Sequence, residues 1–263
     1  MSYLNRFKNN VSLAKYTTFK IGGPARYFFV ARTTEDLIKA IQLAKEKNLP
    51  FFILGGGSNL LVSDKGFSGL VIVVNSKQLT IINNSIIAEA GVRLSDLVRE
   101  SSKAGLIGLE WAINIPGTIG GAVKCQTGAF GQSILKMVKE IKKIDKIILS
   151  VELVLKKGDK KKSQQLIKEY FKKRKDSQPL DYPSAGCIFK NPVGKFAGQL
   201  IEECGLKGKQ IGKAMVSQKH ANFIVNLGEA QAKDVKKLIQ LIKKSVKEKF
   251  NLDLEEEIKY LGF

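Results

Sequence analysis

Histidine and cysteine are scarce in this chain of 263 residues, and their scarcity excludes several kinds of site. His220 is the only histidine, and the three cysteines, Cys125, Cys187 and Cys204, form no CxxC pair. An odd number of scattered cysteines argues against a disulfide framework, and one histidine leaves too few ligands for a zinc site. We therefore expect no bound metal.

Long apolar runs are also missing. No stretch of 18 or more apolar residues occurs, so we expect no membrane-spanning segment and no membrane partner. The first ten residues, MSYLNRFKNN, lack the apolar core and the small-residue cleavage site of a secretory signal. The sequence therefore predicts a soluble, cytoplasmic protein.

Acidic residues are in the minority, which gives a formal net charge of +20. The lysines are densest in residues 155–175 and 233–249, and neither stretch has interleaved aromatic residues or a DNA-binding motif. We favour solvated lysine-rich faces over a nucleic-acid partner, which would give steeply salt-dependent binding. A positive field of this kind also steers anionic small substrates.

Hydrophobic periodicity predicts an α+β protein. The apolar positions of residues 232–250 recur at helical spacing and give the clearest helix. Asn83–Asn84 is the expected turn of a hairpin, and Gly158–Asp159 marks the expected domain boundary. The other expected strands are 26–31, 51–54, 69–74, 147–155 and 221–226, and the other expected helices are 33–48, 93–105, 163–175 and 196–205.

Two glycine-rich segments raise the question of a ligand. GGGSN (55–59) directly follows the expected strand FFIL, and INIPGTIGGAVKCQTGAFG (113–131) carries five more glycines. Glycines let backbone N–H groups approach an anion with no Cβ in the way. Two such loops suit a ligand with a pyrophosphate and a flat ring system, although two unrelated tight turns would leave the same pattern.

Longer motifs carry a resemblance to a known family. TTFKIGGPARYF (17–28), LGGGSNLLVSDKGFSGLVI (54–72) and IPGTIGGAV…GAFG (115–131) resemble the flavin-binding half of UDP-N-acetylenolpyruvoylglucosamine reductases. PSAGCIFKNP (183–192), VSQKHANFIVN (216–226) and LEEEIKYLG (254–262) resemble the substrate half and C-terminus of that family, in the same order. The short middle of the chain resembles the compact type, without an extra substrate-capping insertion.

The resemblance implies a fold and a division into domains. The fold is an α+β arrangement of a FAD-binding domain of the vanillyl-alcohol-oxidase (PCMH) type and a smaller α+β substrate domain. Residues 1–157 would form the FAD-binding domain, with subdomains of about 1–54 and 55–157. Residues 158–250 would bind substrate, and 251–263 would carry a catalytic glutamate.

The resemblance also implies an activity. In the family, NADPH reduces FAD, and the reduced flavin passes hydride to UDP-N-acetylglucosamine enolpyruvate, giving UDP-N-acetylmuramate for peptidoglycan, and so for the cell wall. We expect FAD and NADPH as cofactors, the enolpyruvyl sugar as substrate and a monomeric enzyme. The positions that match the family's FAD-binding motifs are Gly55, Gly56, Gly57, Ser58, Asn59, Pro116, Gly117, Thr118, Gly120, Gly121, Ala122 and Val123.

Two catalytic residues carry over by motif position. Cys187 stands where the family usually has a serine that donates a proton, and a thiol is a stronger acid than an alcohol. Glu257 matches the C-terminal glutamate, although the family's preceding proline is replaced by Glu256. Like-charged neighbours favour a protonated carboxyl there. A packing role for Cys187 and a solvated acidic patch at 255–257 are the alternatives.

Further positions match with less specific motifs. Lys190, Asn191 and Lys219 are expected to bind substrate, and His220 to form structural hydrogen bonds. Gln126 and Thr127 replace residues that the family tends to have beside the flavin, and Cys125 is expected to be packed.

One departure from the family pattern affects catalysis. The family arginine lies in a YRxS element before the strand 147–155, and no arginine occurs between Arg99 and Arg174. Lys139, Lys142, Lys143 and Lys146 are the candidate cations, but a lysine lacks the planar fork of a guanidinium. An alternative is therefore a FAD- or UDP-sugar-binding protein with weak or lost catalysis. Another flavin-linked oxidase is a third possibility, which the substrate-domain motifs disfavour.

Overall fold

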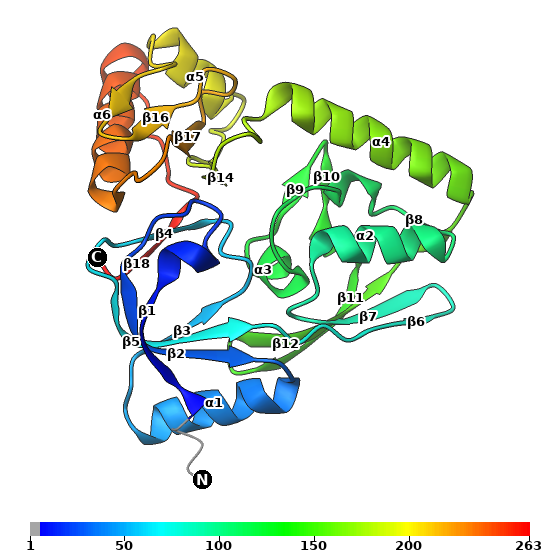
Figure 1. The fold of residues 1–263 in the computed structure, drawn as a ribbon. Coiled ribbons are helices and arrows are strands. Elements are labelled where there is room, and N and C mark those ends of the chain that lie inside the picture. The colour runs from blue at the N-terminus through cyan, green and yellow to red at the C-terminus, as the bar shows by residue number, and fades with distance from the viewer. Residues whose placement is uncertain (1–5) are drawn as a thin grey trace. The chain divides into compact units, whose positions relative to one another are not determined.

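A computed structural model describes residues 6–263 as two compact units, each built from several chain segments (Figure 1). Unit 1 comprises 6–8, 28–56 and 69–176, and unit 2 comprises 9–27, 57–68 and 177–263. The chain passes between the units inside the first glycine-rich segment, between Gly56 and Gly57. The functional division expected at residue 158 stays a prediction, and the compact units have a different outline because helix α4 belongs largely to unit 1.

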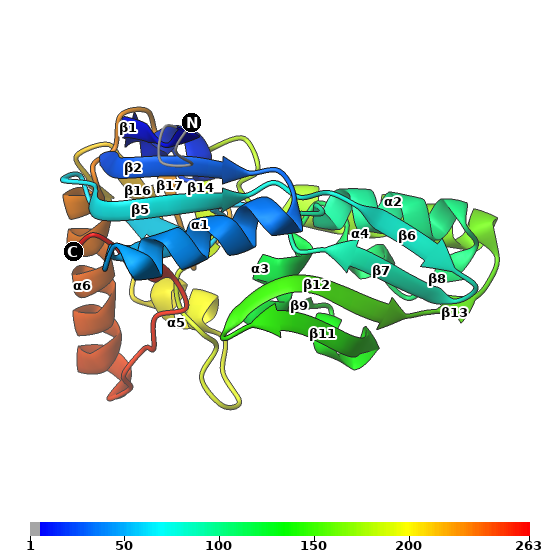
Figure 2. The ribbon, with the colours of Figure 1, turned by 90° about the horizontal axis from the view of Figure 1, so that it is seen from below.

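The first sheet has the strand order β1-β2-β5-β3, from β1 (Lys8–Ser12), β2 (Pro24–Ala31), β5 (Phe67–Val74) and β3 (Phe51–Leu54). Within unit 1, β3 runs parallel to β5 with Leu54 opposite Val73, so both strands end at the same edge. Helix α1 (Thr34–Glu46) runs alongside these strands (Figure 2). It begins at Thr33, whose side chain accepts from the Asp36 N–H.

A second, antiparallel sheet in unit 1 has the order β11-β12-β7-β6. Its strands are β6 (Leu79–Ile82), β7 (Ser85–Glu89), β11 (Val138–Ile144) and β12 (Ile147–Val154). Helices α2 (Leu94–Lys103) and α3 (Ile119–Lys124) pack against β7 and β12 in one apolar core. The remaining elements of unit 1 are β8 (Leu106–Ile107), η3 (Glu110–Ala112), β9 (Gly128–Ala129), β10 (Gln132–Ser133), η4 (Ile134–Met137), β13 (Lys156–Lys157) and α4 (Lys160–Ser177).

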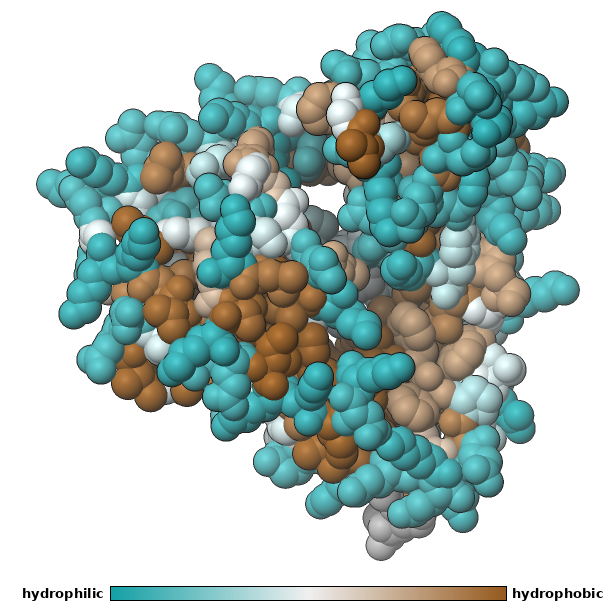
Figure 3. Space-filling view, turned by 180° about the vertical axis from the view of Figure 1, so that it is seen from behind, coloured by the Kyte–Doolittle hydropathy of each residue, from teal (hydrophilic) through white to brown (hydrophobic). Residues whose placement is uncertain are grey.

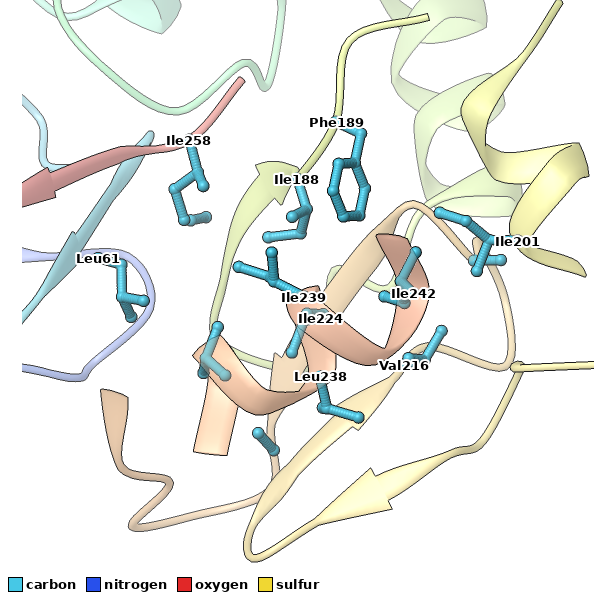
Figure 4. Packing of buried hydrophobic residues seen from close by; sticks show 14 of the residues in the cluster. Leu61, Ile188, Phe189, Ile201, Val216, Ile224, Leu238, Ile239, Ile242 and Ile258 are labelled. Atoms are coloured by element: carbon cyan, nitrogen blue, oxygen red, sulfur yellow. The ribbon is translucent and has the colours of Figure 1, made fainter. Parts of the chain in front are cut away.

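Unit 2 is built on a sheet of order β14-β17-β16-β15. Helix α6 (Ala232–Phe250) buries Val235, Leu238, Ile239, Ile242 and Val246 in the core that it forms with this sheet (Figure 4). The strands are β14 (Ser184–Cys187), β15 (Gln210–Ile211), β16 (Ala214–Val216) and β17 (Phe223–Asn226). Unit 2 also contains η2 (Leu13–Tyr16), α5 (Ala197–Glu203), β4 (Leu60–Val62) and β18 (Lys259–Leu261).

Two long-range contacts close unit 2. Strand β18 pairs parallel with β4, placing Lys259 opposite Leu60. Asp64 accepts from the N–H groups of Ala232 at 2.8 Å and Lys233 at 3.1 Å, so it caps α6 from a distant part of the chain. The helix ends at Asn251, which adopts a left-handed conformation (φ 53°).

Most predicted elements are confirmed within one to three residues, and helix 232–250 in both bounds. Three elements were not predicted from the sequence. Residues 184–187 form strand β14, 138–144 form strand β11, and 119–124 form helix α3 inside the second glycine-rich segment. In each case tertiary pairing stabilises a segment whose own residue pattern is weak for that structure.

Candidate active site

The two glycine-rich segments meet in unit 1. A Cβ built on Gly56 would lie 2.5 Å from Gly117 Cα, and one on Gly55 would lie 2.8 Å from Thr118 Oγ1. Carbon atoms do not approach so closely without displacement, so the backbones of the two segments touch only because both are glycine-rich. The sequence prediction that one ligand site uses both segments is thus geometrically possible.

A cavity of about 410 Å³ opens beside this contact. Gly55 and Val74 lie where the parallel strands β3 and β5 end, so the sheet delivers both to one edge. Polar side chains and glycines make up much of the rest. The lining residues are Gly55, Gly56, Val73, Val74, Asn75, Lys77, Gly91, Arg93, Ser95, Asn114, Ile115, Pro116, Gly117 and Thr118.

A second cavity of about 320 Å³ shares Gly55, Val74 and Thr118 with the first. Its wall is more apolar, and Lys124 and Lys146 supply positive charge. The other lining residues are Phe52, Ile53, Ala90, Gly120, Gly121, Ile147 and Ile148. Together the two cavities offer a polar compartment and a more apolar compartment on either side of Gly55, Val74 and Thr118, which fits a ligand with a charged part and a flat apolar part.

Backbone donors decide which segment can hold an anion. Within residues 6–263, the N–H groups of Gly55, Gly56, Gly57 and Ser58 donate to no protein acceptor. The first N–H groups of α3 are occupied: Ile119 donates to Val92 O, Gly120 to Ala90 O, and Gly121 to Thr118 Oγ1. The GGGSN segment therefore fits a pyrophosphate, whereas the start of α3 has its donors already used.

Only some of the residues that are predicted to bind the cofactor line the two cavities. Gly55, Gly56, Pro116, Gly117, Thr118, Gly120 and Gly121 line the cavities. Gly57, Ser58 and Asn59 belong to unit 2, and Ala122 and Val123 are buried in the α3 core. Sequence reasoning missed Asn75, Lys77, Gly91, Arg93 and Ser95 of the first cavity. Asn75 offered a signal, because it follows an apolar strand just as Gly55 does.

Cys187 lies at the end of strand β14 in unit 2. Gly186 has φ +76°, and the pairing of β14 with β17 shifts register between Ser184 and Cys187. Such a bulge re-aims the residue that follows it. Ile188 is buried, and its N–H donates to Asn222 O at 2.8 Å, which fixes the backbone beside the partly buried Cys187.

Glu257 lies beside the same strand extension. Its N–H donates to Ile188 O at 2.8 Å, and Phe189 and Glu256 form a bridge pair. The neighbouring Ile258 is buried in the core that also holds Ile188 (Figure 4). Burial raises the pKa of the Glu257 carboxyl, and the charges of Lys190 and Lys259 oppose that shift only in part. The site can therefore hold Glu257 protonated at a higher pH than an exposed glutamate.

Thr18 joins the glycine-rich loop to β14 within unit 2. Its Oγ1 donates to Ser184 O at 2.7 Å, and its N–H donates to Gly57 O at 3.1 Å. Gly57 has φ +61°, and a Cβ there would lie 2.2 Å from Tyr16 O. This close approach explains why the third glycine of GGGSN is required even though it lines neither cavity.

The predicted substrate-binding residues have other contacts in the structure. Lys190 pairs with Glu255, and Asn191 Oδ1 accepts from the Ala197 N–H at 3.0 Å, which caps α5. Lys219 is exposed, and its N–H donates to Ser217 Oγ at 3.1 Å. Their expected contacts with substrate stay predictions.

His220 and Cys125 are placed clearly. His220 Nδ1 accepts from the Asn222 N–H at 3.2 Å, and burial lowers the pKa of the imidazole, which agrees with a structural role. Cys125 is exposed at the end of α3, so the expectation that it is packed was wrong. Cys125 directly follows Lys124, the last residue of this short helix.

The region expected to contain the arginine element is a tight hairpin. Strands β11 and β12 are joined by Asp145 and Lys146 alone, with Asp145 at φ 51°. Among the candidate cations, Lys139 pairs with Glu152 at 2.8 Å, while Lys146 lines the second cavity. The turn leaves no residues for a further element.

No group of three or more histidine, cysteine or acidic residues within 6–263 is arranged to hold a metal ion. None of the helices in that range has the length and apolar character needed to cross a membrane.

Comparison with known proteins gives two family matches. Residues 178–261 match the family model described as UDP-N-acetylenolpyruvoylglucosamine reductase, C-terminal domain. Residues 25–162 match that of a FAD binding domain. The predicted α+β fold with a FAD-binding domain is confirmed by this match and by the structural comparison that follows.

Curated relatives and a solved structure match over nearly the whole chain. UDP-N-acetylenolpyruvoylglucosamine reductase of Caldicellulosiruptor bescii is 42% identical, covering 97% of this chain and 91% of the relative. That of Clostridium novyi is 39% identical, with 97% and 92% covered. The crystal structure of the Thermus caldophilus reductase is similar with a TM-score of 0.84 and 36% identity, covering 98% and 99% of the two chains.

Proposed function

Because the chain belongs to the UDP-N-acetylenolpyruvoylglucosamine reductase family, we propose that it reduces UDP-N-acetylglucosamine enolpyruvate to UDP-N-acetylmuramate with electrons from NADPH. The observation that carries the proposal is the meeting of Gly56 and Gly117 beside two adjacent cavities in the part of the chain that matches a FAD-binding domain. We infer that the enzyme acts in the cytoplasm and is a monomer. Light scattering of the purified protein tests the oligomeric state.

The first role of the chain is to hold FAD. The N–H groups of Gly55–Ser58 would receive its pyrophosphate, and the cavity walls would hold the rest of the cofactor. When bound, FAD accepts hydride from the nicotinamide and supplies it to the substrate. The polar lining, including Asn75 and Arg93, suits the hydroxyl and phosphate groups of such a ligand.

The second role is to deliver a proton. Cys187 Sγ–H would donate it to the substrate carbon adjacent to the one that receives hydride. A thiol is a stronger acid than the alcohol of a serine, so the Cys187 side chain can act as this acid. The bulge at Gly186 and the buried Ile188 support this role, because they fix the backbone on both sides of the thiol.

The third role is to stabilise negative charge on the substrate. Reduction places charge on the substrate carboxylate side, and a protonated Glu257 would donate a hydrogen bond to it. The raised pKa of Glu257 supports this assignment. Lys190, Asn191 and Lys219 would contribute to binding of the sugar nucleotide.

A second candidate function follows from the hairpin turn at Asp145–Lys146. Without the arginine element, the protein would bind FAD or a UDP-sugar and turn over slowly. Lys146, which lines the second cavity, is the cation that we propose as a partial substitute. A lysine provides a point charge but no bidentate fork, so a lower rate is the expected cost.

Anaerobic flavin absorbance separates the two functions. NADPH should bleach the FAD-loaded protein, and the enolpyruvyl sugar should restore the absorbance. Bleaching without recovery would leave flavin reduction intact and favour the binding protein. Absence of flavin from protein purified and reconstituted with FAD would overturn both.

A further inference from the structure

Glu257 is held by its backbone and not by its side chain. Within residues 6–263, its carboxyl makes no hydrogen bond and no ion pair with another residue. Its N–H donates to Ile188 O at 2.8 Å, and its C=O accepts from Asn59 Nδ2 at 3.2 Å. These two bonds help to fix the backbone from which the carboxyl extends.

The bond to Ile188 ties Glu257 to the strand extension that follows Cys187. The neighbouring residues reinforce it, because Lys190 N donates to Glu255 O at 2.9 Å and Phe189 bridges with Glu256. This side of the segment sets Glu257 directly next to the backbone that carries the thiol. These bonds hold the Glu257 segment only on the side that faces residues 188–190. They do not restrain its other side.

Asn59 supplies the opposite side. Besides the bond from its side chain, its C=O accepts from the Lys259 N–H at 3.1 Å, directly before β18 joins β4. One residue thus bonds to the chain on both sides of Ile258. The sequence assigned Asn59 to cofactor binding, but its side-chain amide donates to the segment that carries Glu257.

We propose that Asn59 is a positioning residue, which fixes Glu257 relative to the Cys187 strand and connects the flavin-binding glycine loop to the acid side of the reaction. The inference rests on the proposed function for its catalytic consequence. Its structural basis is separate, since Asn59, Ile188 and Glu257 all belong to unit 2. The loop reaches the cavity wall at Gly56, three residues before Asn59.

The chemistry requires a neutral donor at residue 59. An aspartate has nearly the same size, but its ionised carboxylate can only accept, so it would face the Glu257 carbonyl with no proton to share. Alanine removes the group altogether. Misplacement of a catalytic group by about 1 Å can slow a reaction by roughly 10²-fold.

The test measures the two half-reactions by stopped flow in Asn59→Ala and Asn59→Asp. We expect flavin content and reduction by NADPH to stay within about twofold of the wild type, and reoxidation by the enolpyruvyl sugar to slow about tenfold or more. Asn84→Ala is the matched control, because Asn84 Nδ2 donates to a distant backbone carbonyl, Leu155 O, at 3.4 Å. That variant should keep both rates.

Deuterium exchange of residues 255–261 gives a readout that does not depend on turnover. Exchange in this segment should rise in both Asn59 variants and stay unchanged in Asn84→Ala. Loss of flavin with unchanged exchange would make Asn59 a flavin ligand and overturn the proposal. Unchanged exchange together with wild-type reoxidation would overturn it as well. If the wild type itself is not reoxidised, the proposed function fails, and the exchange data alone support or refute the placement of Glu257.

Discussion

Cys187 exposes the proposed reaction to reagents that a serine would resist. A thiolate is the nucleophile in alkylation, and Cys187 is only partly buried. We expect iodoacetamide to inactivate the wild type, and Cys187→Ser to keep most of its turnover after the same treatment. Cys187→Ala, which has no proton to give, should lose about 10²–10⁴-fold in the rate of flavin reoxidation.

The exposed Cys125 provides the control for this experiment, since the reagent will modify it too. Cys125→Ser should be inactivated as fast as the wild type. If Cys187→Ser were inactivated equally fast, the sensitive group would lie elsewhere in the protein and the role of the thiol would lose its support.

The raised pKa of Glu257 makes the folded state less stable as the pH rises. Its pKa in the folded state lies above the ordinary value of 4.5 because burial disfavours the charged form. Its contribution to stability is then fully present below pH 4.5 and is lost as the pH rises through the folded pKa. Above pH 4.5 the folded protein therefore bears a cost for burying this carboxyl, which the unfolded chain would ionise freely.

Glu257→Gln removes this cost along with the acid. We expect the variant to unfold at a higher temperature than the wild type at pH 7, with the difference shrinking as the pH falls toward 4.5. Reoxidation of the flavin should become slower in the same variant. Thermal unfolding from pH 4 to 8 checks the first effect, and a variant less stable than the wild type at pH 7 would contradict it.

The distance from an added Cβ to its neighbours shows which glycines are required for two segments to touch. A methyl group at residue 56 would overlap Gly117 Cα, so Gly56→Ala must push the two glycine-rich segments apart. We expect the purified variant to lose most of its flavin, measured by absorbance of the released cofactor. Gly194→Ala is the control, because nothing lies within 4 Å of its added Cβ and Gly194 lines neither cavity. Equal flavin in both variants would argue against this view of the contact.

Helix α6 depends on a cap that comes from another part of the chain. Asp64→Ala leaves the N–H groups of Ala232 and Lys233 without their acceptor. We expect a loss of about 1 kcal/mol, equivalent to roughly 2–4 °C in the unfolding temperature. Asp64→Asn keeps one oxygen acceptor and should lose less. Identical unfolding of all three proteins would show that the cap does not limit stability.

Local pattern predicted those elements whose residues agree with their final state. For helix α6, the sequence predicted both the apolar face and the residues at which the helix begins and ends. Strand β14 was missed because Gly186 interrupts the alternation with a bulge. Strand β11 was missed because its lysines are exposed and only pairing with β12 makes it a strand. Helix α3 is rich in glycine, and bonds to Val92 and Ala90 hold its first turn.

The site was predictable where one motif supplies both residue and backbone. Gly55, Gly56, Gly117 and Thr118, which the motifs place in the FAD site, line the first cavity, and their contact with FAD stays a prediction. Arg93 and Asn75 were missed because their place depends on how distant strands pair. Asn59 shows the reverse case: its motif predicts a flavin contact, and its side chain bonds to the backbone of Glu257.

The whole molecule carries a strong positive charge, and its anionic substrates should sense it. Hydrophilic residues cover much of the face seen in Figure 3, with hydrophobic patches between them. Helix α4 alone has seven lysines and one arginine against two acidic residues. We expect kcat/KM to fall as NaCl rises from 0.02 to about 0.5 M, because the Debye length shrinks to a few ångströms.

Electrostatic steering changes the rate at which the substrate associates with the protein, and not the rate of the chemical step. The rate of flavin reoxidation at saturating substrate should therefore change little over the same range of salt. A flat kcat/KM would show that the lysines act only as a solvated surface, which the sequence favours over nucleic-acid binding.

Unit 2 is built from chain segments that lie far apart in the sequence, so its parts are synthesised at different times. Strand β4 pairs only with β18 among the described strands, and about 200 residues separate them. At roughly 5–20 residues per second, a ribosome needs on the order of 10–40 s to supply that partner. The segment that carries Glu257 comes into place with β18. A nascent chain can therefore form much of unit 1 first, whereas Glu257, the proposed catalytic acid, is positioned only after the last strand has been made.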